Sequence, residues 1–128
     1  MRYLLDTHAF LWYLEDSPKL PSRVAELIDS SENEIYICSV SLWEIVIKMS
    51  LNKYRIDFSL DDLYNEIYTY ALMVLGIKKD YLKVLSELPF IHKDPFDRLI
   101  ISSAIAEGLT IISIDENIHN YDVSCVWK

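Results

Sequence analysis

Four carboxylates stand where apolar runs end or where helices are expected to begin: Asp6, Glu44, Asp97 and Asp115. Asp6 follows the apolar run 3–5, and Asp115 follows the run 110–114. Carboxylates gathered in one place repel one another and take up protons unless a cation lies among them. Oxygen ligands select Mg²⁺ or Mn²⁺. The chemistry that this pattern predicts is hydrolysis of a phosphate ester by a metal-activated water.

Each of the four carboxylates also has an ordinary structural explanation. Asp6 could cap a helix after the first strand, and Glu44 could close a capping box with Ser41. Asp97 would favour the positive end of its helix, and Asp115 could belong to a simple turn. Taken singly, each residue is better explained by its local role. It is the joint pattern that predicts a site.

The elements that must position these residues follow from apolar runs alternating with amphipathic segments. Strands are expected at residues 3–5, 35–38, 73–75, 111–114 and 124–127. Helices are expected at residues 9–15, 22–29, 41–50, from about 60, 79–88, and from 95 to a cap at 108. Continuous apolar strands between helices are typical of a parallel sheet covered on both faces. We predict one α/β domain over residues 1–128, in three layers with a central parallel sheet of four or five strands.

The predicted fold brings the carboxylates to one edge of the sheet. Ligands of parallel α/β sheets bind beyond the carboxyl ends of the strands, near a switch in strand order. Asp6 and Asp115 are expected at such ends, while Glu44 and Asp97 are expected in the first turns of helices that begin there. The fold therefore predicts a single acidic rim.

Composition agrees with a cytoplasmic globular protein. A chain of 128 residues is long enough to bury a core, and the run of about 20 apolar residues that crosses a bilayer is missing. The first apolar run is short and is interrupted at once by Asp6, so a signal peptide is not expected. Cys38 and Cys125 match neither a zinc spacing nor a disulfide framework, so free thiols are expected.

The net charge of −8 argues superficially against a nucleic-acid partner, because phosphate binding usually relies on Lys and Arg. That argument weakens if the carboxylates hold divalent ions, because a cation-loaded acidic site attracts phosphate. Charge alone does not decide the partner.

Residues beside the four carboxylates are candidate supports. Arg98 is expected either to pair with a carboxylate or to hold substrate phosphate, and Asp94 is expected to cap a helix rather than bind metal. His8 and His92 flank the site, and hydrogen-bonding support is favoured over acid–base catalysis. Lys48, Lys53 and Arg55 could line a path for RNA, although a solvated basic face is the default.

Aromatic residues on the early helices suggest a contact surface for other proteins. Trp43 is expected in the core. Trp12 and Tyr13 are candidates for a dimer or partner groove, because aromatic anchors dominate such interfaces. Tyr64, Tyr68 and Tyr70 would extend this surface, with helix packing as the alternative.

The four carboxylates also lie within motifs that resemble the PIN-domain family, and within it the VapC-type toxins of toxin–antitoxin pairs. The matching segments are LLDTHAFLW (residues 4–12), SLWEI (41–45), HKDPFDRLI (92–100) and SID (113–115). They recur in the family's order, and the likeness spans residue 4 to about residue 126. One departure is Ser113, where relatives often have Thr. Either hydroxyl could hold a water or orient a carboxylate.

The resemblance implies a Mg²⁺- or Mn²⁺-dependent endoribonuclease that cuts RNA, often tRNA or rRNA. The acidic quartet of the family carries over onto Asp6, Glu44, Asp97 and Asp115, as both metal ligands and catalytic residues. The resemblance also implies a cognate VapB-type antitoxin and a homodimer, with no membrane association. It assigns no residue to substrate binding.

Two other functions remain open on the sequence. One is a PIN-shaped module that docks a protein or RNA without cleaving it. The other is a metal-dependent phosphatase of small molecules on a similar scaffold. The chain lacks an Asp-x-Asp motif after its first strand, which disfavours a phosphatase of the aspartyl-phosphate type.

Overall fold

A computed structural model describes residues 1–51 and 59–127 of the chain. Its strands are β1 (Arg2–Leu5), β2 (Glu34–Cys38), β3 (Met73–Leu75), β4 (Thr110–Ile112) and β5 (Cys125–Val126). Its helices are α1 (Thr7–Leu14), α2 (Ser22–Asp29), α3 (Ser39–Ser50), α4 (Leu60–Thr69), α5 (Lys79–Glu87), α6 (Pro95–Glu107) and α7 (Glu116–His119). Lys53 and Arg55, the candidates for an RNA path, lie outside the described residues.

The strands form one parallel sheet in the order β3-β2-β1-β4-β5. Leu4 of the central strand pairs with Tyr36 on one side and with Ile111 on the other. After β1 the chain fills one half of the sheet with β2 and β3, and later the other half with β4 and β5. The switch in strand order therefore falls between β1 and β4, which confirms the predicted parallel sheet.

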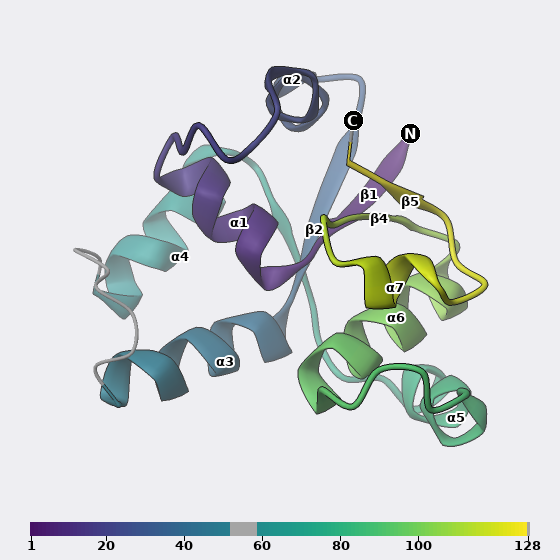
Figure 1. The fold of residues 1–128 in the computed structure, drawn as a ribbon. Coiled ribbons are helices and arrows are strands. Elements are labelled where there is room, and N and C mark those ends of the chain that lie inside the picture. Colours follow the sequence, from purple (N-terminus) through teal and green to yellow (C-terminus); the bar gives the residue numbers. More distant parts are fainter. Residues whose placement is uncertain (52–58, 128) are drawn as a thin grey trace.

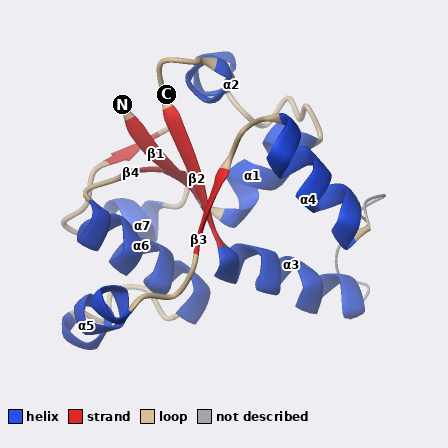
Figure 2. Ribbon diagram, turned by 180° about the vertical axis from the view of Figure 1, so that it is seen from behind, coloured by secondary structure: helices blue, strands red, loops and turns tan. Residues whose placement is uncertain are grey.

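Helices cover both faces of the sheet, and successive strand residues supply the two halves of the core (Figures 1 and 2). Tyr3 and Leu5 pack in one apolar cluster with residues of α1, α2, α3 and α4. Leu4 packs in the other cluster, with α5, α6 and α7. Side chains of a strand point alternately to its two faces, so a strand buried on both sides must be apolar throughout.

Helix starts and ends follow local signals in the sequence. Asp94 caps α6, Pro95 takes its first position, and Gly108 ends it with the left-handed φ of 68° that glycine adopts without strain. Both cysteines are free. Among the described residues, no helix has the length and apolar character needed to cross a bilayer.

Two predictions about α3 are wrong. The helix begins at Ser39, directly after β2, so Glu44 lies in its second turn and cannot close a capping box with Ser41. Trp43, expected in the core, is 60% exposed, and its ring meets the edge of Phe96 at 5.3 Å between centroids. The inward side of α3 is occupied by buried neighbours such as Ile45, which leaves position 43 facing outward.

Candidate metal centre

Asp6 lies at the carboxyl end of β1 and caps α1. One of its carboxylate oxygens accepts a hydrogen bond of 2.8 Å from the backbone N–H of Ala9. The side chain is almost completely buried, and burial raises the pKa of Asp6. Hydrogen bonds from Ser113 and Ala9 lower that pKa, whereas the nearby charge of Asp115 raises it. Asp6 and Asp115 are thus electrostatic neighbours, as their adjacent strands require.

Asp115 lies beyond β4 and caps α7, a single helical turn where only a simple turn was expected. Its Oδ1 accepts a hydrogen bond of 2.9 Å from the backbone N–H of Asn117. The hydroxyl of Ser113 is fully buried and accepts a hydrogen bond of 3.0 Å from the backbone N–H of Asp115. Because Ser113 also bonds to Asp6, it connects these two acidic residues.

Asp97 lies in the first turn of α6. Asp94 caps that helix by accepting two backbone hydrogen bonds of 2.8 and 3.1 Å, the role expected of it. The pKa of Asp97 is raised to about 7, first by burial and then by the charges of Asp94, Asp6 and Glu44, while His92 opposes the shift. Burial and the charges of the other acidic residues therefore disfavour the ionised form of Asp97, and His92 offsets this only in part.

Glu44 is buried on α3 and has partners for both oxygens. The Thr7 hydroxyl donates to its Oε1 at 2.8 Å, and the Lys48 ammonium lies 3.0 Å from its Oε2. The hydroxyls of Thr7 and Ser41 are 3.0 Å apart, so all these groups form one network. Glu44 is thus tied to the start of α1, one residue beyond Asp6.

His92 bridges two of the acidic residues. Its Nε2 lies 2.8 Å from Oδ2 of Asp97 and 3.1 Å from Oδ2 of Asp115. Ligand atoms of these three residues all lie within 4.8 Å of one another, so Nε2 is placed either to join the carboxylates on one ion or to donate a hydrogen bond to them. This group, drawn from the described residues, does not include Asp6 or Glu44. The sequence placed His92 near the site, but no motif in it indicated the bridge.

Arg98 binds backbone carbonyls and a tyrosine hydroxyl, and none of its described contacts is to a carboxylate. Its guanidinium donates to the carbonyl oxygens of Pro89 at 2.9 Å and Leu88 at 3.3 Å, and to the hydroxyl of Tyr121 at 3.3 Å. It also packs 3.9 Å from the ring centre of Phe90. The side chain is buried and supports the segment after α5, so the expected pairing with a carboxylate is wrong for the described residues.

His8 is less closely associated with the acidic residues than His92 is. It is exposed, and its ring centre lies 5.7 Å from that of Trp12. Its charge contributes to lowering the pKa of Asp6. The structure therefore brings His92, and not His8, into hydrogen-bond contact with the acidic rim.

The donor set fits a hard divalent cation. Carboxylate oxygens predominate, and the pKa of Asp97 is raised to about 7 by burial and, after it, by the charges of Asp94, Asp6 and Glu44. A divalent ion would remove that repulsion, and oxygen donors are those that Mg²⁺ and Mn²⁺ prefer.

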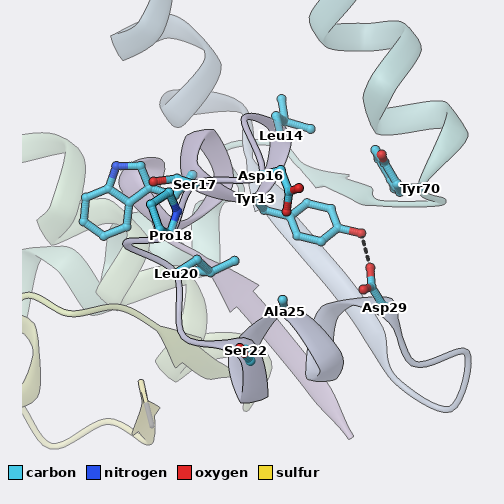
Figure 3. Close-up of a pocket in the computed structure, with 11 residues that line it drawn as sticks. Tyr13, Leu14, Asp16, Ser17, Pro18, Leu20, Ser22, Ala25, Asp29 and Tyr70 are labelled. Carbon is cyan, nitrogen blue, oxygen red and sulfur yellow. Dashed lines mark hydrogen bonds between the residues drawn. The ribbon is translucent and has the colours of Figure 1, made fainter.

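A pocket of about 600 Å³ lies apart from these carboxylates, between α1, α2 and the end of α4 (Figure 3). Trp12, Tyr13 and Tyr70 contribute to its wall. The hydroxyl of Tyr13 donates to Asp29, and its ring meets that of Tyr70 edge-on at 5.1 Å. Trp12 and Tyr13, the candidates for a partner groove, thus line a concavity.

Comparison with known proteins gives one family and several solved structures. A family model described as PIN domain matches residues 3–124. A search of curated proteins found no significant match. VapBC2 from Rickettsia felis, bound to a DNA fragment of its promoter, is similar with a TM-score of 0.74 and 20% identity over 100% of both chains. DNA-bound VapBC from Salmonella typhimurium is similar with a TM-score of 0.70 and 16% identity, over 100% of this chain and 99% of that chain. FitAcB from Neisseria gonorrhoeae is similar with a TM-score of 0.65 and 16% identity, over 96% of this chain and 95% of that chain.

Proposed function

The chain belongs to the PIN-domain family, and from this premise we propose that it is a Mg²⁺- or Mn²⁺-dependent endoribonuclease, the toxin of a VapBC-type pair. The observation that carries the proposal is the acidic rim at the switch point of the sheet. Asp97 there has a pKa near 7 because burial and the charges of Asp94, Asp6 and Glu44 disfavour its ionised form. A site of this kind favours a divalent cation, and through it a phosphate substrate.

In this proposal Asp6, Asp97, Asp115 and Glu44 hold the metal. A bound divalent ion supplies a Lewis acid for the phosphate group and lowers the pKa of water. The chain supplies orientation, because Ser113 bonds to Asp6 and to the backbone of Asp115. Asp94 stays a helix cap.

RNA is the proposed substrate, with tRNA and rRNA as the first candidates, and the chain is proposed to act as one domain in the cytoplasm. The decisive experiment is induced expression followed by mapping of new RNA 5′ ends. The purified protein should then cut the mapped RNA in Mg²⁺ or Mn²⁺ and stop when EDTA is added. RNA binding without cleavage would support a docking module, and turnover of phosphomonoesters with intact RNA would support a phosphatase.

We further propose a VapB-type antitoxin as partner, because similar solved structures are VapBC complexes. The pocket of Figure 3 is the proposed docking site. Its wall sets aromatic rings beside the polar side chains of Asp16, Ser17 and Asp29, which suits an amphipathic anchor from the partner. A homodimer of this chain is also proposed, and light scattering of the purified protein tests it.

Replacing Tyr70 by Ala should weaken binding of the antitoxin. Tyr70 is 47% exposed and lines the pocket, and loss of an anchoring tyrosine costs about 1–2 kcal/mol, or roughly 5- to 30-fold in affinity. The partner for a calorimetric titration is sought in the reading frame next to the gene. Tyr68→Ala is the matched control, because Tyr68 is 88% exposed on α4 and does not line this pocket. Equal affinity for the two variants would remove the pocket from the interface.

A further inference from the structure

The hydrogen bonds of His92 define which of its ring nitrogens carries the proton. Nδ1 accepts a hydrogen bond of 3.3 Å from the backbone N–H of Asp94. In the neutral imidazole the other nitrogen, Nε2, must then be the donor. Nε2 lies 2.8 Å from Asp97 and 3.1 Å from Asp115, so its single N–H is shared between two carboxylates that would otherwise repel each other.

The backbone of His92 is itself held from outside the rim, by Tyr121. The hydroxyl of Tyr121 accepts hydrogen bonds from the backbone N–H groups of His92 at 2.8 Å and Ile91 at 3.0 Å. It donates to the carbonyl of Pro89 at 2.8 Å. Arg98 bonds to the same carbonyl and to the same hydroxyl. Tyr121 and Arg98 are both buried, which makes this framework rigid.

We propose that His92, held in place by the Tyr121 hydroxyl, is a positioning residue that keeps Asp97 and Asp115 together for metal binding. This inference rests on the proposed metal-dependent function. The imidazole touches the carboxylates and leaves their remaining lone pairs to the ion. Hydrogen-bond partners of metal-binding side chains fix the orientation of those side chains, and their removal lowers metal affinity by about 10- to 100-fold.

Calorimetric titration of the whole protein with Mn²⁺ tests this role. His92→Ala should lower Mn²⁺ affinity about 10- to 100-fold. His92→Gln should recover most of the loss, because a side-chain amide offers two N–H donors to the two carboxylates. Tyr121→Phe keeps the buried ring and removes only the hydroxyl, so it should lower affinity by a smaller factor, below about tenfold.

The control is Tyr81→Phe. Tyr81 is also buried, and its hydroxyl donates to Glu107 at 2.7 Å, away from His92 and the acidic rim. This variant loses a buried tyrosine hydroxyl of the same kind and should bind Mn²⁺ as the wild type does. Thermal unfolding of each variant defines a temperature at which all are folded, and the titrations are compared there.

Asp97→Asn separates this inference from the proposed function. If Asp97→Asn loses Mn²⁺ binding while His92→Ala and Tyr121→Phe keep it, the positioning role is wrong and the metal centre stands. If Asp97→Asn binds Mn²⁺ as well as the wild type, the metal centre itself is wrong. Tighter binding in His92→Ala would show that the imidazole competes with the ion, and would also overturn the proposal.

Discussion

Replacing Asp97 by Asn should abolish RNA cleavage while leaving the protein folded. A metal ion contributes several kcal/mol of charge stabilisation in phosphoryl chemistry, so the loss should be at least about a hundredfold in rate. Asn has nearly the shape of Asp and can still accept the hydrogen bond from His92, so the local contacts are kept. The measurement is single-turnover cleavage of the mapped RNA in saturating Mg²⁺, with circular dichroism to verify the fold.

Asp80→Asn is the matched control for this experiment. Asp80 is an exposed carboxylate in the first turn of α5, as Asp97 is in the first turn of α6. The same chemical change there should leave the cleavage rate unaltered. Wild-type cleavage by Asp97→Asn would mean that the metal is held elsewhere or that no metal takes part.

Metal-free protein should lose stability as the pH rises from about 4 to about 7. Asp97 has a pKa of about 7 when folded, against about 3.9 for an ordinary Asp, so within this window the folded state binds more protons than the unfolded state. The free energy of unfolding therefore falls with rising pH, by roughly 4 kcal/mol at most. Burial also raises the pKa of Asp6, which adds to the same trend.

Denaturant unfolding at several pH values, in EDTA, measures this loss. The Asp97→Asn variant isolates the contribution of one carboxyl: it should be more stable than wild type at pH 8, with the difference shrinking toward pH 4. Stabilisation by an added divalent ion should instead increase with pH. The ion binds the ionised carboxylate, so the affinity of the protein for the ion rises until about pH 7. A wild-type stability that is flat with pH, or that rises, would mean that burial and the neighbouring charges do not raise the pKa of folded Asp97.

The layout of the sheet could be predicted from sequence because its signals are local. Strands buried on both faces must be short, continuous apolar runs, and 3–5 and 111–112 are such runs. Helix ends carry their own marks, as Asp94-Pro95 and Gly108 do at α6. Once the strands are parallel, the positions of Asp6 and Asp115 at one edge follow from topology.

The contacts around the rim depend on tertiary geometry, and there the sequence was a weaker guide. Arg98 was expected either to pair with a carboxylate or to hold substrate phosphate. Successive helix residues point about 100° apart, and Arg98 donates to the Pro89 carbonyl, away from Asp97. Trp43 was expected inside because it is aromatic, but α3 turns it outward. The bridge made by His92 joins residues five and 23 positions away, beyond the reach of any local motif.

The acidic residues differ in whether they also cap a helix, and this difference should affect which mutations are recovered in a genetic selection. Asp6 and Asp115 each satisfy the start of a helix, whereas Asp97 accepts no cap bond and Glu44 lies in the second turn of α3. Cells that survive expression of an active toxin would carry inactivating alleles. Substitutions at Asp97 would persist as soluble, silent protein, while non-capping substitutions at Asp6 would also reduce protein abundance. The spectrum of escape alleles would thus separate an acidic residue that caps no helix from those that the fold also needs.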